Sequence, residues 1–392
     1  MEQSKASAGA ADQKGTEQYA AMHPDLSYAL LGATGLFVSA AGFGSYRIDA
    51  SEPSHEEALT YALRSGINLI DTSANYTDGG SERLIGQVLG KLTAQGDFSR
   101  DQVVVVSKAG YLQGENYQLS QERKAAGHPF PDLVLAGEGL EHCIHPEFLA
   151  DQITRSLARL HLQSLDCCLL HNPEYYLNEA KSEGVPVAPA REEYYRRIRQ
   201  AFLQLEREVD AGRISSYGIS SNTFPGEADD YNFTSLAKVW DIAEEISADH
   251  RFRVIEFPLN LMETGAVLRT NQPTGQSLVE FAKSKNLGVL INRPLNAIVD
   301  GRLVRLAEKH YYGEGAAQAR RFRDKTAALD EDWSAAENLS QIALRVIRST
   351  AGISSVLMGM RSRPYVEDVL AELRRPCRIA SRTDSWKKVE DL

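Results

Sequence analysis

The chain has 392 residues, of which 43% are hydrophobic and 24% are charged, as in an ordinary folded globular protein. Its formal net charge of −10 argues against a general nucleic-acid-binding surface, and no apolar run approaches the roughly 18 residues of a membrane span. The four cysteines form no C-x-x-C pair, which argues against a disulfide scaffold and predicts a cytoplasmic protein.

Residues 1–25 are rich in Ala, Gly, Ser and Gln and lack the apolar centre of a secretory signal. They predict a flexible leader. The next stretch, YALLGATGLFVSAAGFG, contains two β-prone pieces separated by ATG. This arrangement predicts an N-terminal β-hairpin that leads into a first strand within residues 37–43.

A regular alternation follows, in which short apolar runs are separated by longer segments with helical periodicity. Fully apolar runs are typical of parallel strands that are covered by helices. Together with residues 37–43 there are eight such runs, the others being 68–73, 103–108, 165–171, 214–220, 253–260, 287–295 and 354–359. Eight units predict a closed (β/α)₈ TIM barrel over residues 26–374, followed by a C-terminal tail over 375–392. The alternative is an open doubly wound sheet, but the G-x-G-x-x-G turn usual after its first strand is missing.

Local signals suggest where several helices begin and end. Ser54 and Glu57 have the spacing of a capping box at the start of the first helix after the hairpin. Gly66, Gly212 and Gly352 fall where helices are expected to stop. In the tail, Trp386 favours docking against the barrel.

Three segments are too long to be ordinary connections, namely residues 110–145, 172–190 and 296–333. Each follows the C-terminal end of a predicted strand. In a parallel barrel these ends share one face, where active sites are built. The sequence therefore predicts enlarged loops around a single mouth.

Four polar residues lie at or just beyond these strand ends: Asp71, Tyr76, Lys108 and His171. A phenol in water has a pKa of about 10, and a neighbouring ammonium is expected to lower it. A carboxylate can hold that ammonium in place, and an imidazole can orient a substrate oxygen. The set suits reduction of a carbonyl, with the phenol giving the proton to oxygen.

The sequence resembles the aldo-keto reductases from about residue 30 to about residue 373. The matching stretches include GINLIDTSANYTDGGSERLIGQVL, VVVSKAG, SLDCCLLHNPE, GRISSYGISSN and SSVLMGMRSRPYVEDVL. The resemblance implies a (β/α)₈ barrel that uses a nicotinamide dinucleotide. It also implies a catalytic tetrad of Asp71, Tyr76, Lys108 and His171, with Tyr76 as the general acid–base.

The resemblance further implies residues that bind the cofactor. The nicotinamide side would use Ser220 and Asn222, with Ser221 inserted between them. Glu256 stands where the family has a glutamine on the sixth strand, and a carboxylate can only accept hydrogen bonds. Asn292 and Arg293 take the place where the family often has an aromatic ring.

The stretch GMRSRPYVED resembles the segment that holds the adenosine phosphate. Gly359 would let the backbone approach a phosphate, and Asp368 would contact the adenine. Arg361 and Arg363 would pair with a 2′-phosphate, which favours NADP(H) over NAD(H), although NAD(H) remains possible.

The aromatic residues Tyr111, Tyr117 and Phe130 in the first long segment could line a substrate wall, or else pack that segment onto the barrel. His142, Cys143 and His145 lie close together, but no second cluster completes a metal site, so no metal is expected. Cys167 and Cys168 should face opposite sides of one strand as small core residues.

These observations predict an oxidoreductase that interconverts an aldehyde, ketone or sugar with its alcohol, acting on a small molecule as a monomer or small homo-oligomer. Two alternatives stay open. One is an NAD(P)⁺-dependent sugar dehydrogenase, because the sequence does not set the direction. The other is a regulatory subunit that binds the cofactor, similar to the β subunits of potassium channels. Neither a nucleic acid nor a membrane is expected as a partner.

Overall fold

The computed structural model describes residues 9–273, 275–299, 301–307 and 312–392. Eight parallel strands close into a barrel in chain order, which confirms the predicted (β/α)₈ fold. The barrel strands are β3 (Ala41–Gly44), β4 (Leu69–Asp71), β5 (Val104–Ala109), β9 (Cys167–His171), β10 (Tyr217–Ser220), β11 (Phe252–Pro258), β12 (Gly288–Asn292) and β15 (Ser355–Gly359).

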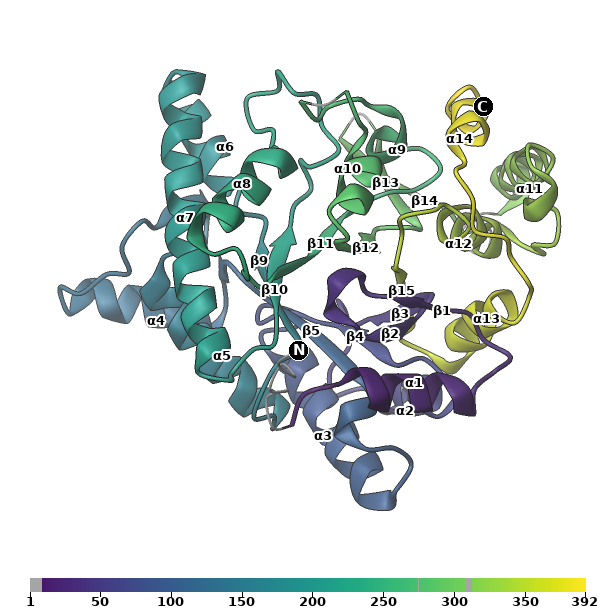
Figure 1. Ribbon diagram of the computed structural model, residues 1–392, viewed down its shortest axis with the longest axis horizontal. Coiled ribbons are helices and arrows are strands. Elements are labelled where there is room, and N and C mark those ends of the chain that lie inside the picture. The colour runs from purple at the N-terminus through teal and green to yellow at the C-terminus, as the bar shows by residue number, and fades with distance from the viewer. Residues whose placement is uncertain (1–8, 274, 300, 308–311) are drawn as a thin grey trace.

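Helices surround the barrel, as Figure 1 shows. They shield the outward apolar side chains of the strands, which is why the strands read as continuous apolar runs. The covering helices are α2 (Pro53–Arg64), α3 (Gly80–Gln95), α5 (Pro146–Leu160), α7 (Val187–Asp210), α8 (Leu236–Ile246), α10 (Leu278–Ser284), α12 (Leu339–Arg348) and α13 (Arg363–Leu373).

Inside the barrel a smaller apolar cluster fills the lower part of the cylinder. Residues two apart on a strand share a face, so Val104 and Val106 point inward while Val105 points to the helices. Cys167 likewise belongs to the inner cluster and Cys168 to the outer one, as predicted. Leu31 joins the inner cluster from the N-terminal hairpin of β1 (Tyr28–Leu30) and β2 (Phe37–Ser39), next to the short 3₁₀ helix η1 (Gly32–Thr34).

The predicted flexible leader is wrong for the described part of residues 1–25. Residues Gln13–Met22 form helix α1, whose first turn is capped by the side chain of Asp12. Tyr19 is buried, and its hydroxyl donates to the backbone oxygen of Leu63 in α2. Tyr19 and contacts to the 3₁₀ helix η2 (Arg100–Gln102) hold α1 against the barrel. Residues 1–8 lie outside the described residues.

The helix stops are confirmed, but the capping box is not. Gly66, Gly212 and Gly352 have φ angles of 104°, 70° and 100°, which suit glycine at helix ends. Helix α2 instead begins at Pro53, whose fixed φ and missing N–H suit the first helical position. Ser54 therefore lies inside the first turn, where it cannot act as the cap.

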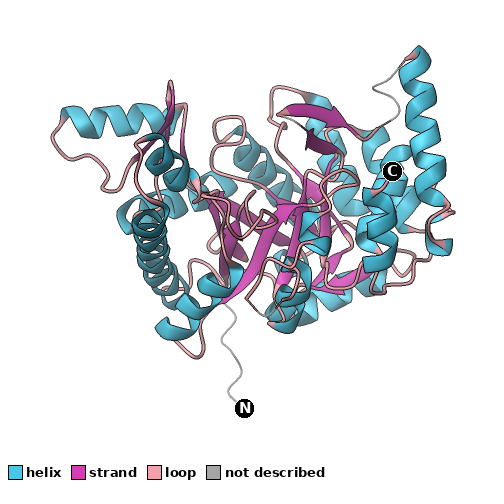
Figure 2. Cartoon of the chain, turned by 90° about the horizontal axis from the view of Figure 1, so that it is seen from above, coloured by secondary structure: helices cyan, strands magenta, loops and turns pink. Residues whose placement is uncertain are grey.

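The long segments carry secondary structure of their own, and Figure 2 shows short strands standing outside the barrel. Segment 110–145 contains a three-stranded antiparallel sheet in the order β6-β8-β7. Residues 300 and 308–311 of segment 296–333 lie outside the described residues. The elements of these segments are β6 (Tyr111–Leu112), α4 (Glu115–Ala125), β7 (Val134–Gly137), β8 (Leu140–His142), α6 (Tyr175–Ser182), β13 (Asn296–Val299), β14 (Arg302–Arg305), α11 (Gly313–Ala327) and η4 (Glu331–Trp333). The short helix α9 (Gly265–Leu268) lies between β11 and α10.

The C-terminal tail docks, as Trp386 predicted. It forms α14 (Thr383–Glu390), which packs against α9. Trp386 is fully buried, and its indole N–H donates to Thr350 Oγ1 over 2.9 Å. Across the described ranges, no helix combines the length and the apolar character that crossing a bilayer requires.

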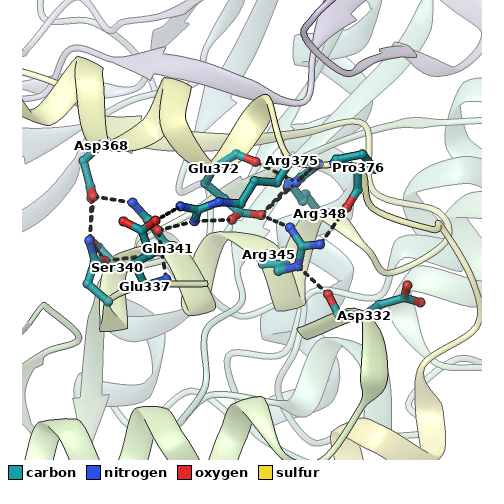
Figure 3. A network of polar contacts seen from close by, with 11 residues as sticks. Asp332, Glu337, Ser340, Gln341, Arg345, Arg348, Asp368, Glu372, Arg375 and Pro376 are labelled. Carbon is teal, nitrogen blue, oxygen red and sulfur yellow. Dashed lines mark hydrogen bonds and ion pairs between the residues drawn. The ribbon is translucent and has the colours of Figure 1, made fainter. Parts of the chain in front are cut away.

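A buried polar network ties α12 to α13 and to the start of the tail, as Figure 3 shows. Glu372 Oε1 accepts from Arg345 Nη1 and from Arg348 Nη2, each over 2.8 Å. At the other end of the network, Asp368 accepts from the hydroxyl of Ser340 and from Gln341 Nε2. The two helices that flank β15 are therefore fixed relative to each other.

Candidate active site

The inner faces of the strands place polar residues one layer above the inner apolar cluster. Val106 in β5 and Val254 in β11 belong to that cluster, and Lys108 and Glu256 follow two residues later on the same faces. Asp71, His171, Asn292 and Gly359 likewise each follow two residues after a buried leucine of the inner cluster on their own strand. Asp71, His171, Glu256, Asn292 and Gly359 line a cavity of about 680 Å³ at the C-terminal ends of the strands, and Lys108 lies buried behind this lining.

Lys108 lies at the centre of this layer and is only 1% exposed. Its ammonium donates to the carboxylate of Asp71 and, over 3.4 Å, to the hydroxyl of Tyr76. It also forms an ion pair with Glu256 Oε2 at 3.2 Å. One cation thus links two buried carboxylates and a phenol.

These contacts shift the pKa values of Lys108 and Asp71. Burial alone would lower the pKa of Lys108, but the charges of Asp71 and Glu256 outweigh it and raise that pKa above its ordinary value. Burial and the nearby Glu256 raise the pKa of Asp71 to about 8, although Lys108 opposes this. The ammonium is therefore charged near neutrality, and Asp71 retains a proton there.

Tyr76 reaches the cavity from the turn that follows β4. Thr77 and Asp78 have φ angles of 48° and 54°, and this left-handed turn redirects the chain into α3. The Tyr76 ring packs edge-on against Tyr46, with ring centroids 5.1 Å apart.

The expected lowering of the Tyr76 pKa is wrong for this structure. Burial is the largest effect and raises the pKa of Tyr76 above its ordinary value. Lys108 lowers it, but Asp71 and Glu256 add negative charge that works in the same direction as burial. Tyr76 therefore holds its proton near neutrality and is available as a proton donor.

His171 lies beside Tyr76, with ring centroids 5.9 Å apart. Its Nδ1 lies 3.0 Å from Ser73 Oγ, which fixes the orientation of the ring. Burial and the positive charge of Lys108 hold the pKa of His171 well below its usual range. The imidazole is neutral at ordinary pH, as suits a group that hydrogen-bonds an uncharged substrate oxygen.

A second polar group forms the neighbouring wall. Glu256 Oε1 accepts from Ser220 Oγ over 3.0 Å and from Asn292 Nδ2 over 2.9 Å. The carbonyl oxygen of Asn292 is buried and has no hydrogen-bond donor among the described residues. Asn222 also lines the cavity, held through its backbone N–H by the carboxylate of Glu174. Arg293 lines it too, and pairs with Glu263 at 2.7 Å.

At the far end of the cavity, Gly359, Arg361 and Asp368 contribute to the lining. Arg363 does not, contrary to the prediction. It begins α13, faces outward and pairs with Glu367 on the next turn over 2.9 Å. Of the two arginines predicted to form a fork, one therefore faces the cavity.

Comparison with known proteins assigns the family. A model described as the aldo/keto reductase family matches residues 40–382. The chain belongs to this family. It is therefore an oxidoreductase that depends on a nicotinamide cofactor and interconverts carbonyl and alcohol groups.

Two curated relatives of this aldo/keto reductase show different extents of similarity. It is 24% identical to the L-galactose dehydrogenase of Arabidopsis thaliana over 369 residues, which covers 92% of each chain. It is 32% identical to the NADH-specific methylglyoxal reductase of Escherichia coli over 174 residues. That second match covers 39% of this chain and 48% of the relative.

Solved structures show the same fold. The glycerol dehydrogenase of Gluconobacter oxydans is 17% identical with a TM-score of 0.59, and the match covers 93% of this chain and 94% of that one. An aldo/keto reductase of Klebsiella pneumoniae, in complex with NADP and acetate, is also 17% identical with a TM-score of 0.53. That match covers 92% and 94% of the two chains.

Of the three aromatic residues predicted for a substrate wall, this aldo/keto reductase uses one to line the cavity. The ring of Tyr111 packs edge-on against His171 with centroids 4.7 Å apart. Phe130 is instead 2% exposed and packs against Phe148 in a separate small cluster. Tyr117 lies on α4, away from the lining.

The residues considered for a metal have other partners. His142 Nε2 lies 2.7 Å from the backbone oxygen of His171, and its ring stacks on Tyr175. The thiol of Cys143 donates to the backbone oxygen of Pro131, and the ring of His145 accepts from the N–H of Glu147 at the start of α5. This trio packs the first long segment onto the barrel.

Several lining residues were missed in the sequence. Most lie after the strand ends or on the long segments, so the lengths of those segments were the signal that could have found them. Asn172, just after His171, has a φ of 52°, which turns its amide toward the hydroxyl of Tyr111 at 2.6 Å. The missed residues include Tyr46, Arg47, Asn75, Gln113, Leu140, Asn172, Tyr175, Leu295, Asn296, Leu303, Arg305 and Ser340.

The lining fits a nicotinamide dinucleotide at both ends of the cavity. The carbonyl oxygen of Asn292 has no hydrogen-bond donor among the described residues, and Oε2 of Glu256 has an ion pair with Lys108 but no hydrogen bond there, so both oxygens could accept from the NH₂ group of a carboxamide. At the other end, Arg361 and the bare backbone of Gly359 suit a phosphate, because an added Cβ at Gly359 would meet no protein atom within 4 Å.

Proposed function

We propose that this enzyme reduces an aldehyde, ketone or sugar carbonyl, with Tyr76 as the proton donor and NADP(H) as the preferred cofactor. The observation that carries the proposal is the 3.4 Å contact between the hydroxyl of Tyr76, which lines the cavity, and the buried Lys108 ammonium. This contact gives a half-buried phenol a charged partner able to stabilise the phenolate that forms when the proton leaves.

Each member of the tetrad has a separate task in this proposal. A bound nicotinamide supplies or accepts the hydride. Tyr76 gives its proton to the carbonyl oxygen, and Lys108 offsets the negative charge that develops on the phenol. Asp71 keeps Lys108 in place, and neutral His171 orients the carbonyl by a hydrogen bond.

The residues proposed to hold the cofactor follow the cavity from one end to the other. Ser220, Asn222, Glu256 and Asn292 would hold the nicotinamide end. Arg361 and Gly359 would bind phosphate, which supports a preference for NADP(H). The Klebsiella pneumoniae relative in complex with NADP is consistent with this preference, while the NADH-specific relative of Escherichia coli keeps NAD(H) open.

A second candidate is oxidation of a sugar with NAD(P)⁺, for which the same tetrad would run in reverse. It is favoured by the match to L-galactose dehydrogenase, which extends over 92% of both chains. A purely regulatory role is less well supported, because the buried tetrad faces an open cavity that can take a substrate.

The proposal is tested with the Tyr76→Phe variant. This change removes the hydroxyl and keeps the ring, so turnover of a panel of aldehydes and sugars should fall at least about a thousandfold, in line with general acid catalysis. NADPH binding, followed by fluorescence, should stay within about threefold of the wild type.

The matched control is Tyr61→Phe, which removes a hydroxyl on the outer helix α2. Its turnover should equal that of the wild type. Full activity of the Tyr76→Phe variant would end the assignment of Tyr76. If the wild type binds NADPH tightly but turns over no compound in either direction, the regulatory alternative would replace the enzyme.

A further inference from the structure

Glu256 brings a second carboxylate into the catalytic layer. It is 2% exposed and lies on the inner face of β11, level with Ser220 in β10. Ser220 and Asn292 both donate to its Oε1, while its Oε2 faces the Lys108 ammonium at 3.2 Å. Two hydrogen-bond donors and one cation therefore face the Glu256 carboxylate, which acts as an acceptor within the network.

The charges in this layer do not cancel when both carboxylates are ionised. Lys108 contributes one positive charge, and Asp71 and Glu256 contribute two negative charges. His171 is neutral and Tyr76 keeps its proton, so neither offsets the difference. A glutamine at position 256 could make the same contacts to Ser220 or Asn292 but would leave the layer neutral.

The reaction requires the nicotinamide ring to lie close to this excess charge. The carbonyl oxygen must reach the Tyr76 hydroxyl, and the hydride must reach the adjoining carbon, about 3–3.5 Å from the ring. The cavity wall beside the Tyr76–Lys108 pair is formed by Ser220, Glu256 and Asn292. A ring in position to react therefore lies against the Glu256 side chain.

We propose that Glu256 makes the site distinguish the two redox states of its nicotinamide cofactor, binding the oxidised state more tightly. The oxidised ring is a cation and the reduced ring is neutral, whereas the carboxamide and phosphates are shared by both. The inference rests on the proposed function and adds to it a redox preference set by one residue. Because the ring becomes positive when hydride leaves, the same carboxylate makes the bound reduced cofactor a stronger hydride donor.

The preference depends on the proton that Asp71 holds near neutrality. The titratable groups that face Asp71 and Glu256 are Lys108 from β5, Tyr76 from the turn after β4, and Cys167 and His171 from β9, with uncharged Ser220 and Asn292 from β10 and β12. Lys108, Tyr76 and Cys167 keep their protons and His171 stays neutral between pH 6.5 and 9. Loss of the Asp71 proton, with a pKa of about 8, therefore completes the excess negative charge.

The experiment measures dissociation constants for NADP⁺ and NADPH with the wild type and the Glu256→Gln variant at pH 9, by calorimetry and cofactor fluorescence. Opposite charges within about 4–6 Å shift equilibria by one to three powers of ten. The ratio of the NADPH to the NADP⁺ dissociation constant should thus be at least about tenfold higher in the wild type. Any change in carboxamide binding affects both states and cancels in this ratio.

The matched control is Glu208→Gln, which changes a buried glutamate that pairs with Arg213 at 2.5 Å outside the cavity. Its ratio should equal that of the wild type. Should Glu256→Gln not fold, the wild type alone remains decisive, since its ratio should rise between pH 6.5 and pH 9. The 2′-phosphate is common to both states and does not affect this trend.

Two results would overturn the inference. Equal ratios for the wild type and Glu256→Gln would show that the carboxylate does not sense the charge of the ring. If the Glu256→Gln variant does not fold, a wild-type ratio that stays constant between pH 6.5 and pH 9 would likewise show that the carboxylate does not sense the charge of the ring. If the wild type binds neither form, the proposed function itself is wrong, which is a different outcome from binding without redox preference.

Discussion

The guanidinium carbon of Arg363 lies 4.4 Å from the centre of the Tyr61 ring, on the outside of the barrel. Arg361, two residues earlier, lines the cavity instead. The N-cap Ser362 lies between them, so Arg361 precedes α13, whereas Arg363 is its first residue and packs its side chain on α2. The two residues therefore form a natural matched pair for testing phosphate recognition.

Replacing Arg361 with alanine should weaken NADPH binding by roughly tenfold to a hundredfold, the usual cost of a lost charge-assisted hydrogen bond. NADH binding should change less than threefold if Arg361 contacts the 2′-phosphate. The Arg363→Ala variant should bind both cofactors like the wild type. Equal weakening of NADPH and NADH by Arg361→Ala would show that the arginine acts on a phosphate common to both.

Gly359, at the end of β15, offers a separate test of the phosphate end. An added Cβ would meet no protein atom within 4 Å, so Gly359→Ala should fold with an unchanged melting temperature. If a phosphate approaches this backbone closely, the methyl group should weaken NADPH binding at least about fivefold. Unchanged affinity, measured by fluorescence titration, would place the phosphate elsewhere. Gly90→Ala, also without protein atoms near the added Cβ but on α3, is the control.

The placement of Asp71, Lys108 and His171 on one rim was predictable because strand periodicity and barrel topology bring the strand ends together. A side chain such as Lys108 lies two residues after an inward valine, and Asp71 and His171 end their strands in the same way. Parallel strands then bring these ends together without any further information about packing. The eight-strand count followed from the same apolar runs.

Other features depended on packing that the sequence does not display. Tyr19 helps to fix α1 through its hydroxyl, which contacts the backbone oxygens of Leu63 and Ile67, and composition cannot reveal this. The sequence left open whether Phe130 lines a substrate wall or packs its segment, and in the structure it packs in a small core. Arg363 was predicted from its chemistry to pair with a phosphate, but its guanidinium lies over the Tyr61 ring. The pKa of Tyr76 was predicted with the wrong sign, because burial and Glu256 were not weighed against Lys108.

Tyr111 and Tyr117 provide a further contrast within the first long segment. Tyr111 packs against His171 and hydrogen-bonds Asn172, whereas Tyr117 stays outside the cavity. The Tyr111→Ala variant should lower kcat/KM at least about tenfold, since a displaced substrate loses its alignment with Tyr76. The Tyr117→Ala variant should change it less than twofold. Similar losses in both variants would indicate that folding of the segment, rather than the wall, governs activity.

The raised pKa of Asp71 makes the stability of the enzyme depend on pH in a defined direction. In the unfolded chain this carboxyl ionises near its ordinary value of 3.8, whereas in the fold its pKa is about 8. Between these values the folded protein holds a proton that the unfolded chain has lost, so this group's contribution to stability is lost as pH rises. The slope is up to about 1.4 kcal/mol per pH unit for one proton.

The measurement is urea unfolding between pH 5 and pH 8, in which the Asp71→Asn variant should lose less stability than the wild type as pH rises. The control is Glu82→Gln, which changes a buried carboxylate paired with Arg159 and should follow the wild type. Parallel curves for Asp71→Asn and the wild type would show that Asp71 does not hold this proton in the folded enzyme.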